Sequence, residues 1–223
     1  VTGMEEGEGG WRVALEGGGG VLRSGKVLLA TGLVDELPEI PGVKENWGAG
    51  VHHCTFCDGF EHRDRPWGLM MEDPALAGHM AFFKGWSGDL RVFTNGRELG
   101  GEALELLRAA EMPVEMARIA EVIGAGDGHA LKKVVLADGR EVGIESLWLR
   151  PKQTQSSLVT ALGLALREDG AVVCDERGES SRAGVYVAGD ATAGPAQQAL
   201  LAAADGARVT FGIIRELVMG TMK

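Results

Sequence analysis

The sequence predicts an α/β protein, and three observations support this fold class. Strand-like and helix-like patterns alternate along most of the 223 residues. Glycine supplies 35 residues, roughly twice the usual share of about 7%, and the glycines gather at turns and strand–helix junctions. Hydrophobic residues make up 45% of the chain, which is an ordinary fraction for a globular protein with a substantial core.

Two strands and a turn are expected near the beginning of the chain. The strands are predicted at residues 11–15 and 21–29, with the glycine run at 17–20 between them. The second strand leads into a tight turn formed by Ala30, Thr31 and Gly32. Two prolines within residues 37–42 then predict a crossing segment between domains, since the residue before a proline favours extended backbone.

The middle of the chain predicts a second α/β unit. Strands are expected at 66–71 and 89–94, helices at 74–84 and 101–110, and a hairpin with an Asp-Gly turn at 131–142. The segment 146–149 leads to a second crossing at Arg150 and Pro151. A buried strand ending in Gly189 and Asp190 follows, and then a long helix from about 196 to 219. The chain is therefore expected to have one domain, split into 1–42 and 151–223, around an inserted domain at 43–150.

Charge and cysteine content exclude several classes of protein. A formal net charge of −10 and a pI near 5.0 argue against nucleic acid or an anionic membrane as the partner. No apolar run reaches the roughly 18 residues of a membrane span, and we expect no secretion leader. Three cysteines, of which Cys174 is expected to be a small core residue, do not resemble a secreted disulfide framework. We therefore expect a cytoplasmic protein.

The first candidate site is the pair Cys54 and Cys57. Two thiols separated by two residues close a disulfide easily when they begin a helix or a tight turn, and nearby amide dipoles favour the thiolate of the first. Asp58 follows directly and is suited to carry the proton released or taken up. Two alternatives stay open: a pair of inert buried cysteines, or half of a zinc site with His52, His53 or His62.

The second candidate site is the turn at Gly189, Asp190 and Ala191. Glycine permits the close approach of a ligand, and a carboxylate accepts hydrogen bonds from a polyol. Behind this turn, Gln198 and Ala199 lie at the start of the long helix, where free backbone N–H groups face an electron-rich ring edge. The alternative is an ordinary strand–turn–helix connection with an aspartate N-cap.

In their order along the chain, these motifs resemble the low-molecular-weight thioredoxin reductases. These are FAD-dependent pyridine nucleotide-disulfide oxidoreductases, and the resemblance runs along essentially all 223 residues. It implies that Cys54 and Cys57 are the redox-active disulfide and that Asp58 is the proton-transfer acid. It further implies a homodimer and a split FAD-binding Rossmann-like domain, incomplete at its N-terminus, with an inserted NAD(P)-domain-like α/β domain.

The resemblance also assigns the FAD contacts. The turns at Ala30, Thr31 and Gly32 and at Gly189, Asp190 and Ala191 would face FAD, and Asp190 would hold its ribityl chain. Gln198 and Ala199 would lie beside the flavin pyrimidine. No strand–GxGxxG–helix unit of the kind that opens family members precedes Val1. We therefore expect these residues to be the downstream part of a longer flavoprotein.

The nicotinamide site departs from the family pattern. Residues 69–74 (LMMEDP) replace the glycine-rich turn, so that Glu72 and Asp73 would face a dianionic pyrophosphate. Residues 94–96 (TNG) replace the basic cluster for the 2′-phosphate and leave only Arg97. The glycine-rich run 124–128 precedes a hairpin and does not open a helix. We therefore expect NADPH not to bind tightly, as in the subgroup that includes the gliotoxin-type dithiol oxidases.

The resulting prediction is a FAD-dependent thiol–disulfide oxidoreductase that uses Cys54 and Cys57. Its expected partner is a small dithiol or disulfide, or a thioredoxin-like protein. The altered nicotinamide site favours either oxidation of a substrate dithiol, with the electrons passing to oxygen, or reduction by an electron donor other than a nicotinamide. The alternative is a non-catalytic remnant without FAD that serves as a scaffold or binding subunit.

Overall fold

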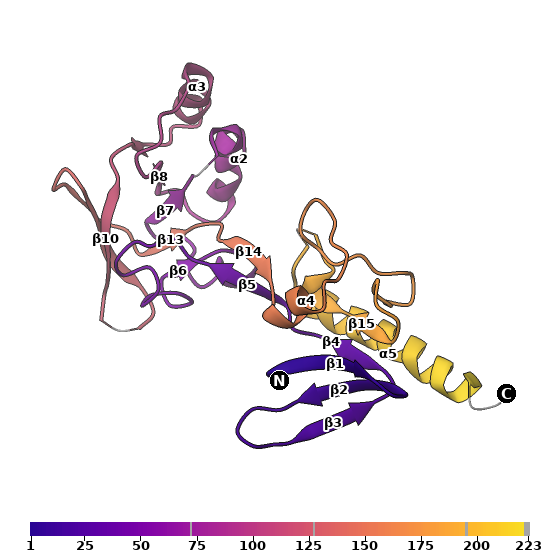
Figure 1. Ribbon diagram of the computed structural model, residues 1–223. Helices are drawn as coiled ribbons and strands as arrows, with labels where there is room; N and C mark the ends of the chain where they lie inside the picture. The colour runs from indigo at the N-terminus through magenta and orange to yellow at the C-terminus, as the bar shows by residue number, and fades with distance from the viewer. Residues whose placement is uncertain (72, 127, 195, 221–223) are drawn as a thin grey trace. The chain divides into compact units, whose positions relative to one another are not determined.

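The chain forms two compact units in a computed structural model that describes residues 1–71, 73–126, 128–194 and 196–220. Unit 1 comprises Val1–Glu36 and Gln153–Lys223, and unit 2 comprises Leu37–Lys152 (Figure 1). Both units contain strands and helices, so the predicted α/β class is confirmed. The assignment of one unit to FAD and the other to a nicotinamide nucleotide stays a prediction.

A parallel sheet of five strands is the framework of unit 2. Its order is β6-β13-β7-β8-β9, and each neighbouring pair is parallel. The strands are β6 (Val51–His52), β7 (Trp67–Met70), β8 (Leu90–Phe93), β9 (Val114–Glu115) and β13 (Ser146–Trp148). All four residues of β7 are buried, which explains the continuous apolar run in the sequence. The strands predicted at 66–71 and 89–94 are confirmed.

The prediction of one helix over 74–84 is wrong. Three short segments lie there: η1 (Pro74–Leu76), α2 (Ala77–Met80) and η2 (Ala81–Gly85). Gly78 and the neighbouring aromatic residues at 82 and 83 have weak helix propensity, and tertiary packing of the aromatic rings decides the local path. The helix predicted at 101–110 is confirmed as α3 (Gly101–Ala109), which buries Ala103 and Leu107, one turn apart.

An antiparallel sheet completes unit 2. It consists of β10 (Ile119–Gly124), β11 (Leu131–Leu136) and β12 (Glu141–Val142). The predicted Asp138-Gly139 turn joins the last two strands, and Gly139 has the expected positive φ of 85°. Gly124 ends β10 and Leu131 begins β11, so the run 124–128 precedes the hairpin of β11 and β12, as expected; Asp127 lies outside the described residues.

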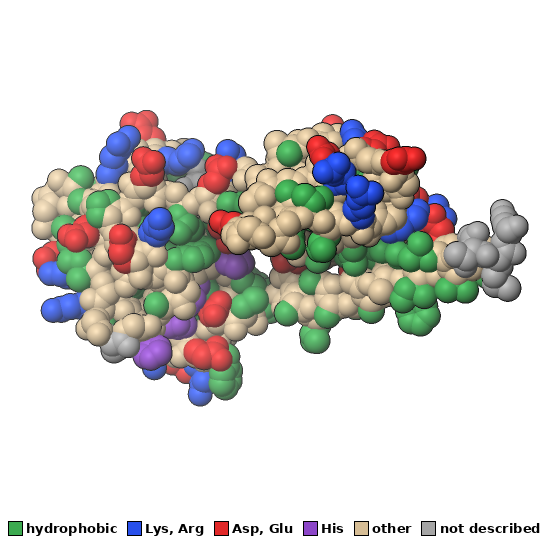
Figure 2. All heavy atoms as spheres, turned by 60° about the horizontal axis from the view of Figure 1, so that its bottom comes forward, with side chains coloured by type: hydrophobic (Ala, Val, Ile, Leu, Met, Phe, Trp, Pro, Cys, Tyr) green, Lys and Arg blue, Asp and Glu red, His purple; other side chains and the backbone are tan. Residues whose placement is uncertain are grey.

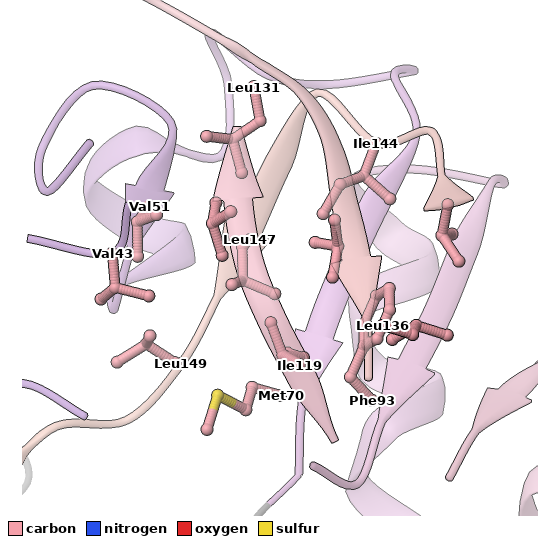
Figure 3. Packing of buried hydrophobic residues seen from close by; sticks show 13 residues of the cluster. Val43, Val51, Met70, Phe93, Ile119, Leu131, Leu136, Ile144, Leu147 and Leu149 are labelled. Atoms are coloured by element: carbon pink, nitrogen blue, oxygen red, sulfur yellow. The ribbon is translucent and has the colours of Figure 1, made fainter. Parts of the chain in front are cut away.

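The core of unit 2 joins its two sheets. Leu131 and Leu136 of β11 pack in one cluster with Phe93 and Leu147 of the parallel sheet (Figure 3). Leu136 and Leu147 are at most 1% exposed. Burial of such side chains contributes about 1.5–3 kcal/mol each, so this cluster fixes the strand ends that carry the candidate site residues.

The described residues of unit 1 form three small sheets. An antiparallel sheet holds β1 (Gly3–Gly7), β2 (Gly10–Ala14) and β3 (Val21–Ser24). A parallel pair holds β4 (Val27–Leu29) and β15 (Val185–Val187), and a further pair holds β5 (Leu33–Glu36) and β14 (Lys152–Gln155). The prediction of one strand over 21–29 is wrong, because the chain bends at Gly25 and starts a new strand at Val27.

The helical segments of unit 1 are α4 (Ser157–Ala161), η3 (Gly189–Ala191) and α5 (Ala199–Gly220). The predicted C-terminal helix is confirmed as α5. Val209 of this helix packs against Tyr186 and is 0% exposed, whereas Leu200 and Phe211 are more than four-fifths exposed. Figure 2 shows the hydrophobic side chains along this helix. Within the described part of the chain, no helix is both long and apolar enough to cross a membrane.

Candidate functional site

The cysteine pair lies on a single helical turn of unit 2. Cys54 is the N-cap of α1 (Thr55–Asp58), and its carbonyl oxygen accepts hydrogen bonds from the N–H groups of Cys57 and Asp58, both at 3.1 Å. The Cys57 thiol donates a hydrogen bond to the Cys54 sulfur at 2.9 Å. A disulfide is about 2.05 Å long, so the two sulfurs can join with little movement. Cys57 is exposed and Cys54 is half-buried, which allows a substrate to reach the pair.

Aromatic rings surround this turn. Trp86 contacts Phe56 edge to face at a centroid distance of 5.5 Å and Phe82 at 5.1 Å. Gly59, directly after α1, lies so close to Trp86 that a Cβ atom there would be 2.6 Å from the indole. The sequence analysis did not single out these rings. The one signal in the sequence is the aromatic residue Phe56 between the two cysteines. In the structure its side chain is 72% exposed.

Asp58 approaches a buried histidine. Its Oδ2 lies 3.7 Å from Nδ1 of His52, whose side chain is 4% exposed, against 44% for Asp58. Burial, helped by neighbouring His62, lowers the pKa of His52 to about 4, although the Asp58 carboxylate opposes the shift. Burial also lowers the pKa of His62. Both imidazoles are therefore mainly neutral at pH 7. Across the described residues, no group of three or more His, Cys, Asp or Glu is arranged to hold a metal ion.

The parallel pairing in unit 1 brings the two predicted FAD turns together. Val187 of β15 lies opposite Leu29 of β4, and the Ala188 N–H donates to the Leu29 carbonyl at 3.0 Å. The turn at 30–32 and the turn at 189–191 therefore leave the sheet side by side, although about 160 positions separate them in sequence. This is the carboxyl edge of parallel strands, where α/β sheets bind ligands. The Ser156 hydroxyl also contacts the Thr31 hydroxyl at 3.0 Å.

Asp190 is available to a ligand at this edge. Gly189 adopts a φ of +79°, which only glycine takes without strain, and its N–H donates to Asp205 at 2.9 Å. Among the described residues, none donates a side-chain or backbone hydrogen bond to the half-buried Asp190 carboxylate. Ala191 is 0% exposed, and its carbonyl oxygen already accepts the Val172 N–H at 2.9 Å, so Asp190 has the side chain of this turn that reaches the surface. The residues present thus fit a polyol such as the ribityl chain of FAD.

The start of α5 lies beside the same turn. A Cβ atom at Gly189 would be 3.5 Å from Ala202, one turn into this helix. The Gln198 carbonyl accepts the Ala202 N–H at 2.9 Å, so Gln198 and Ala199 stand at the helix entrance as expected. The side chain of Gln197, the preceding residue, exchanges hydrogen bonds with Gln153 at 2.8 and 3.0 Å, a partner that the sequence analysis did not single out. Pro195 lies outside the described residues.

The segment that replaces the glycine-rich pyrophosphate turn of the family forms hydrogen bonds within its own chain. The Asp73 carboxylate accepts a hydrogen bond from the Ala75 N–H at 2.9 Å, and η1 has only three residues. After β8, Thr94 is 1% exposed, and the Asn95 side chain accepts the Ile119 N–H at 2.9 Å. Arg97 is exposed. Glu72 lies outside the described residues, so of the two predicted carboxylates only Asp73 is placed.

These features define an α/β protein with a cysteine pair suited to disulfide chemistry. Residues 91–206, about half of the chain, match the family of pyridine nucleotide-disulphide oxidoreductases. The chain therefore belongs to that family, which generally binds FAD, and the resemblance inferred from the sequence motifs is confirmed.

Known proteins with similar sequences and structures agree with this assignment. The chain is 32% identical to thioredoxin reductase tcpT of Claviceps purpurea over 74% of its own length, and 30% identical to thioredoxin reductase sirT of Leptosphaeria maculans over 84%. It spans 54% and 62% of those two proteins. An oxidoreductase from Agrobacterium tumefaciens has a similar structure, with a TM-score of 0.84 and 32% identity. That alignment covers 98% of this chain and 73% of the other.

Proposed function

We propose that this protein is a FAD-dependent thiol–disulfide oxidoreductase of the thioredoxin reductase type that acts as a dithiol oxidase without NADPH. The observation that carries the proposal is the surface turn on which the Cys54 and Cys57 sulfurs lie 2.9 Å apart, with Asp58 on the same turn. Membership of the family supports disulfide chemistry at this pair.

The proposed reaction moves two electrons and two protons from a substrate dithiol to the cysteine pair. A substrate thiolate attacks one sulfur of the Cys54–Cys57 disulfide, breaks that bond and forms a mixed disulfide. The second substrate thiol then displaces the cysteine, and the substrate leaves as a disulfide. Asp58 accepts a proton from the substrate and returns it to a cysteine thiolate. FAD, when bound, supplies the electron acceptor that restores the pair, with dioxygen as the final oxidant.

Unit 1 is proposed to hold FAD at the carboxyl edge of β4 and β15. There Asp190 would accept hydrogen bonds from the ribityl hydroxyls, and Gly189 would allow the chain to approach closely. The turn at 30–32 would contact FAD from the neighbouring strand. Gln198 and Ala199 would lie beside the flavin pyrimidine at the entrance of α5. The half-buried carboxylate of Asp190 supports this assignment.

Operation without NADPH is supported by two local features of unit 2. The Asp73 carboxylate already accepts the Ala75 N–H, a backbone group of the kind that a pyrophosphate uses, and a negative charge there repels a phosphate. The Asn95 side chain accepts the Ile119 N–H and is not free for a ligand. In the loop 94–97 after β8, the cation left to bind a 2′-phosphate is Arg97.

We propose a small dithiol as substrate, and further a cytoplasmic homodimer.

Anaerobic titration of the FAD-loaded protein tests the proposal. Flavin absorbance is followed first with NADPH and then with a dithiol. Bleaching by the dithiol alone, with recovery in air, is expected. Cys57→Ser should abolish bleaching by dithiol, whereas Cys174→Ser is the matched control that should keep it. Rapid bleaching by NADPH would refute the loss of the nicotinamide site, and a protein that stays colourless with added FAD would refute flavin chemistry.

A further inference from the structure

Two buried histidines lie behind the cysteine turn. His52 and His62 are 5% and 7% exposed, and their ring centroids are 4.5 Å apart. Trp148 stacks on His52 at 5.0 Å, and the Trp67 indole N–H donates to the His62 carbonyl at 2.7 Å. The His52 ring is therefore enclosed by aromatic groups and has little freedom to rotate.

Nitrogen atoms of both rings lack partners inside this enclosure. His52 Nε2 and His62 Nδ1 are buried, and no described residue forms a hydrogen bond with either. An unsatisfied buried polar atom costs about 1–3 kcal/mol, so two such atoms side by side are an expensive arrangement for packing alone. Apolar residues of similar size would fill the same space without this cost. The arrangement therefore calls for a role beyond packing.

The other nitrogen of His52 faces the redox turn. His52 Nδ1 lies 3.7 Å from Asp58 Oδ2. This distance is slightly longer than a hydrogen bond, and a small rotation of the half-exposed carboxylate closes it. His52 belongs to strand β6, whose Val51 is 0% exposed, so the imidazole is the fixed partner and Asp58 the mobile one.

The charges around His52 come from few groups. Asp58, His62 and His53 act on it directly, while Arg65, Glu61 and Glu145 act on His62. Among the groups that act on His52 itself, Asp58 alone is an anion. A neutral imidazole carries one N–H, which is therefore drawn towards the Asp58 carboxylate.

We infer that His52 is a positioning residue, held by His62 and Trp148, that orients the Asp58 carboxylate for proton transfer at the Cys54–Cys57 pair. The inference rests on the role of Asp58 in the proposed function. It assigns to the histidine pair a task that neither the zinc alternative nor core packing gives it.

The test measures how fast dithiothreitol reduces the oxidised pair in the protein, across pH and without NADPH. In His52→Leu the N–H towards Asp58 is lost. Reduction should slow about tenfold. A positioned acid–base group speeds proton transfer by roughly 100- to 10,000-fold, and losing its orientation should remove part of that gain. Its pH profile should match that of Asp58→Asn, and the double variant should be no slower than Asp58→Asn. His52→Asn places an amide N–H near the position of Nδ1 and should restore the rate to within about threefold of wild type.

Two comparisons keep the outcome clear. His52→Gln places its amide near Nε2 instead, so it should be slow where His52→Asn is fast; this pair carries the test if His52→Leu does not fold. His79→Leu, an exposed histidine on α2, is the matched control and should react like wild type. Equal rates for His52→Asn and His52→Leu, or an effect that multiplies with that of Asp58→Asn, would overturn the inference.

The inference and the proposed function can fail separately. The assay needs no flavin, so a protein that never binds FAD still reports on His52, and failure of the oxidase proposal appears only in the flavin titration. If the cysteine pair of Asp58→Asn is reduced at the wild-type rate, Asp58 has no role in the proton transfer, and the inference about His52 is overturned.

Discussion

Gly59 controls the geometry of the cysteine turn, and replacing it with alanine should disturb that geometry measurably. Its φ is −66°, an ordinary helical value, so the alanine backbone itself is not strained. A Cβ atom would, however, lie 2.6 Å from Cδ1 and Nε1 of Trp86 and would overlap the Thr55 carbonyl oxygen. Either the indole moves, taking Phe56 and Phe82 with it, or the turn that holds Cys54 and Cys57 opens.

The size of the effect follows from the cost of overpacking. One extra methyl group in a tightly packed place costs about 1–3 kcal/mol. For a chain of this length, each 1 kcal/mol lowers the melting temperature by about 2–4 °C, so Gly59→Ala should melt about 2–12 °C below wild type. Alkylation of Cys57 by iodoacetamide should also change, because its sulfur no longer donates to Cys54 in the same geometry.

Thermal unfolding followed by tryptophan fluorescence measures the stability, and mass spectrometry of alkylated protein measures the reactivity. Gly85→Ala is the matched control, since a Cβ atom there meets nothing within 4 Å. It should leave both properties unchanged. If Gly59→Ala and Gly85→Ala behave alike, the contact between Gly59 and Trp86 does not shape the cysteine turn, and the reasoning is refuted.

Three further predictions concern buried charge and thiol chemistry. The pKa of His52 in the folded protein is about 4, below the usual 6.5, so on acidification the histidine is protonated first in the unfolded chain. Lowering the pH from 7 to 4 should therefore lower the free energy of unfolding by up to about 3 kcal/mol. Urea titrations should show that the free energy of unfolding of His52→Asn falls less between pH 7 and pH 4 than that of wild type. An equal fall in both proteins would contradict the prediction. Glu115 is buried and bridges Arg91 at 2.7 Å and Arg140 at 2.6 Å. Glu115→Leu should destabilise by about 1–3 kcal/mol in denaturant unfolding, because Arg91 loses this anion and Arg140, among the described residues, keeps only Asp138. Glu121 is exposed, and Glu121→Leu is the control that should lower the free energy of unfolding by less than about 0.5 kcal/mol. Equal losses in the two variants would show that the Glu115 ion pairs do not stabilise the fold. Burial raises the pKa of Cys174, so iodoacetamide at pH 8 should label Cys57 well before Cys174; the reverse order would refute the assignment of Cys174 to the interior.

The sequence by itself determined the local elements and the chemistry they carry. Strand β7 follows from a continuous apolar run, and α3 follows from apolar residues one turn apart. The turn at Cys54 and Cys57 and the Gly189–Asp190 connection were also predicted from neighbouring residues alone. These features depend on contacts within a few positions, which local periodicity and residue chemistry record.

Only the tertiary structure decided which distant residues meet. The pairing of β4 with β15 sets the turn at 30–32 beside Asp190, and strand β6 places His52 against Trp148 and Asp58. The break at Gly25 and the three short segments over 74–84 also arise from packing that overrides local propensity. Contacts between residues far apart in sequence depend on how strands are ordered and filled with side chains, and no single stretch of sequence carries that information.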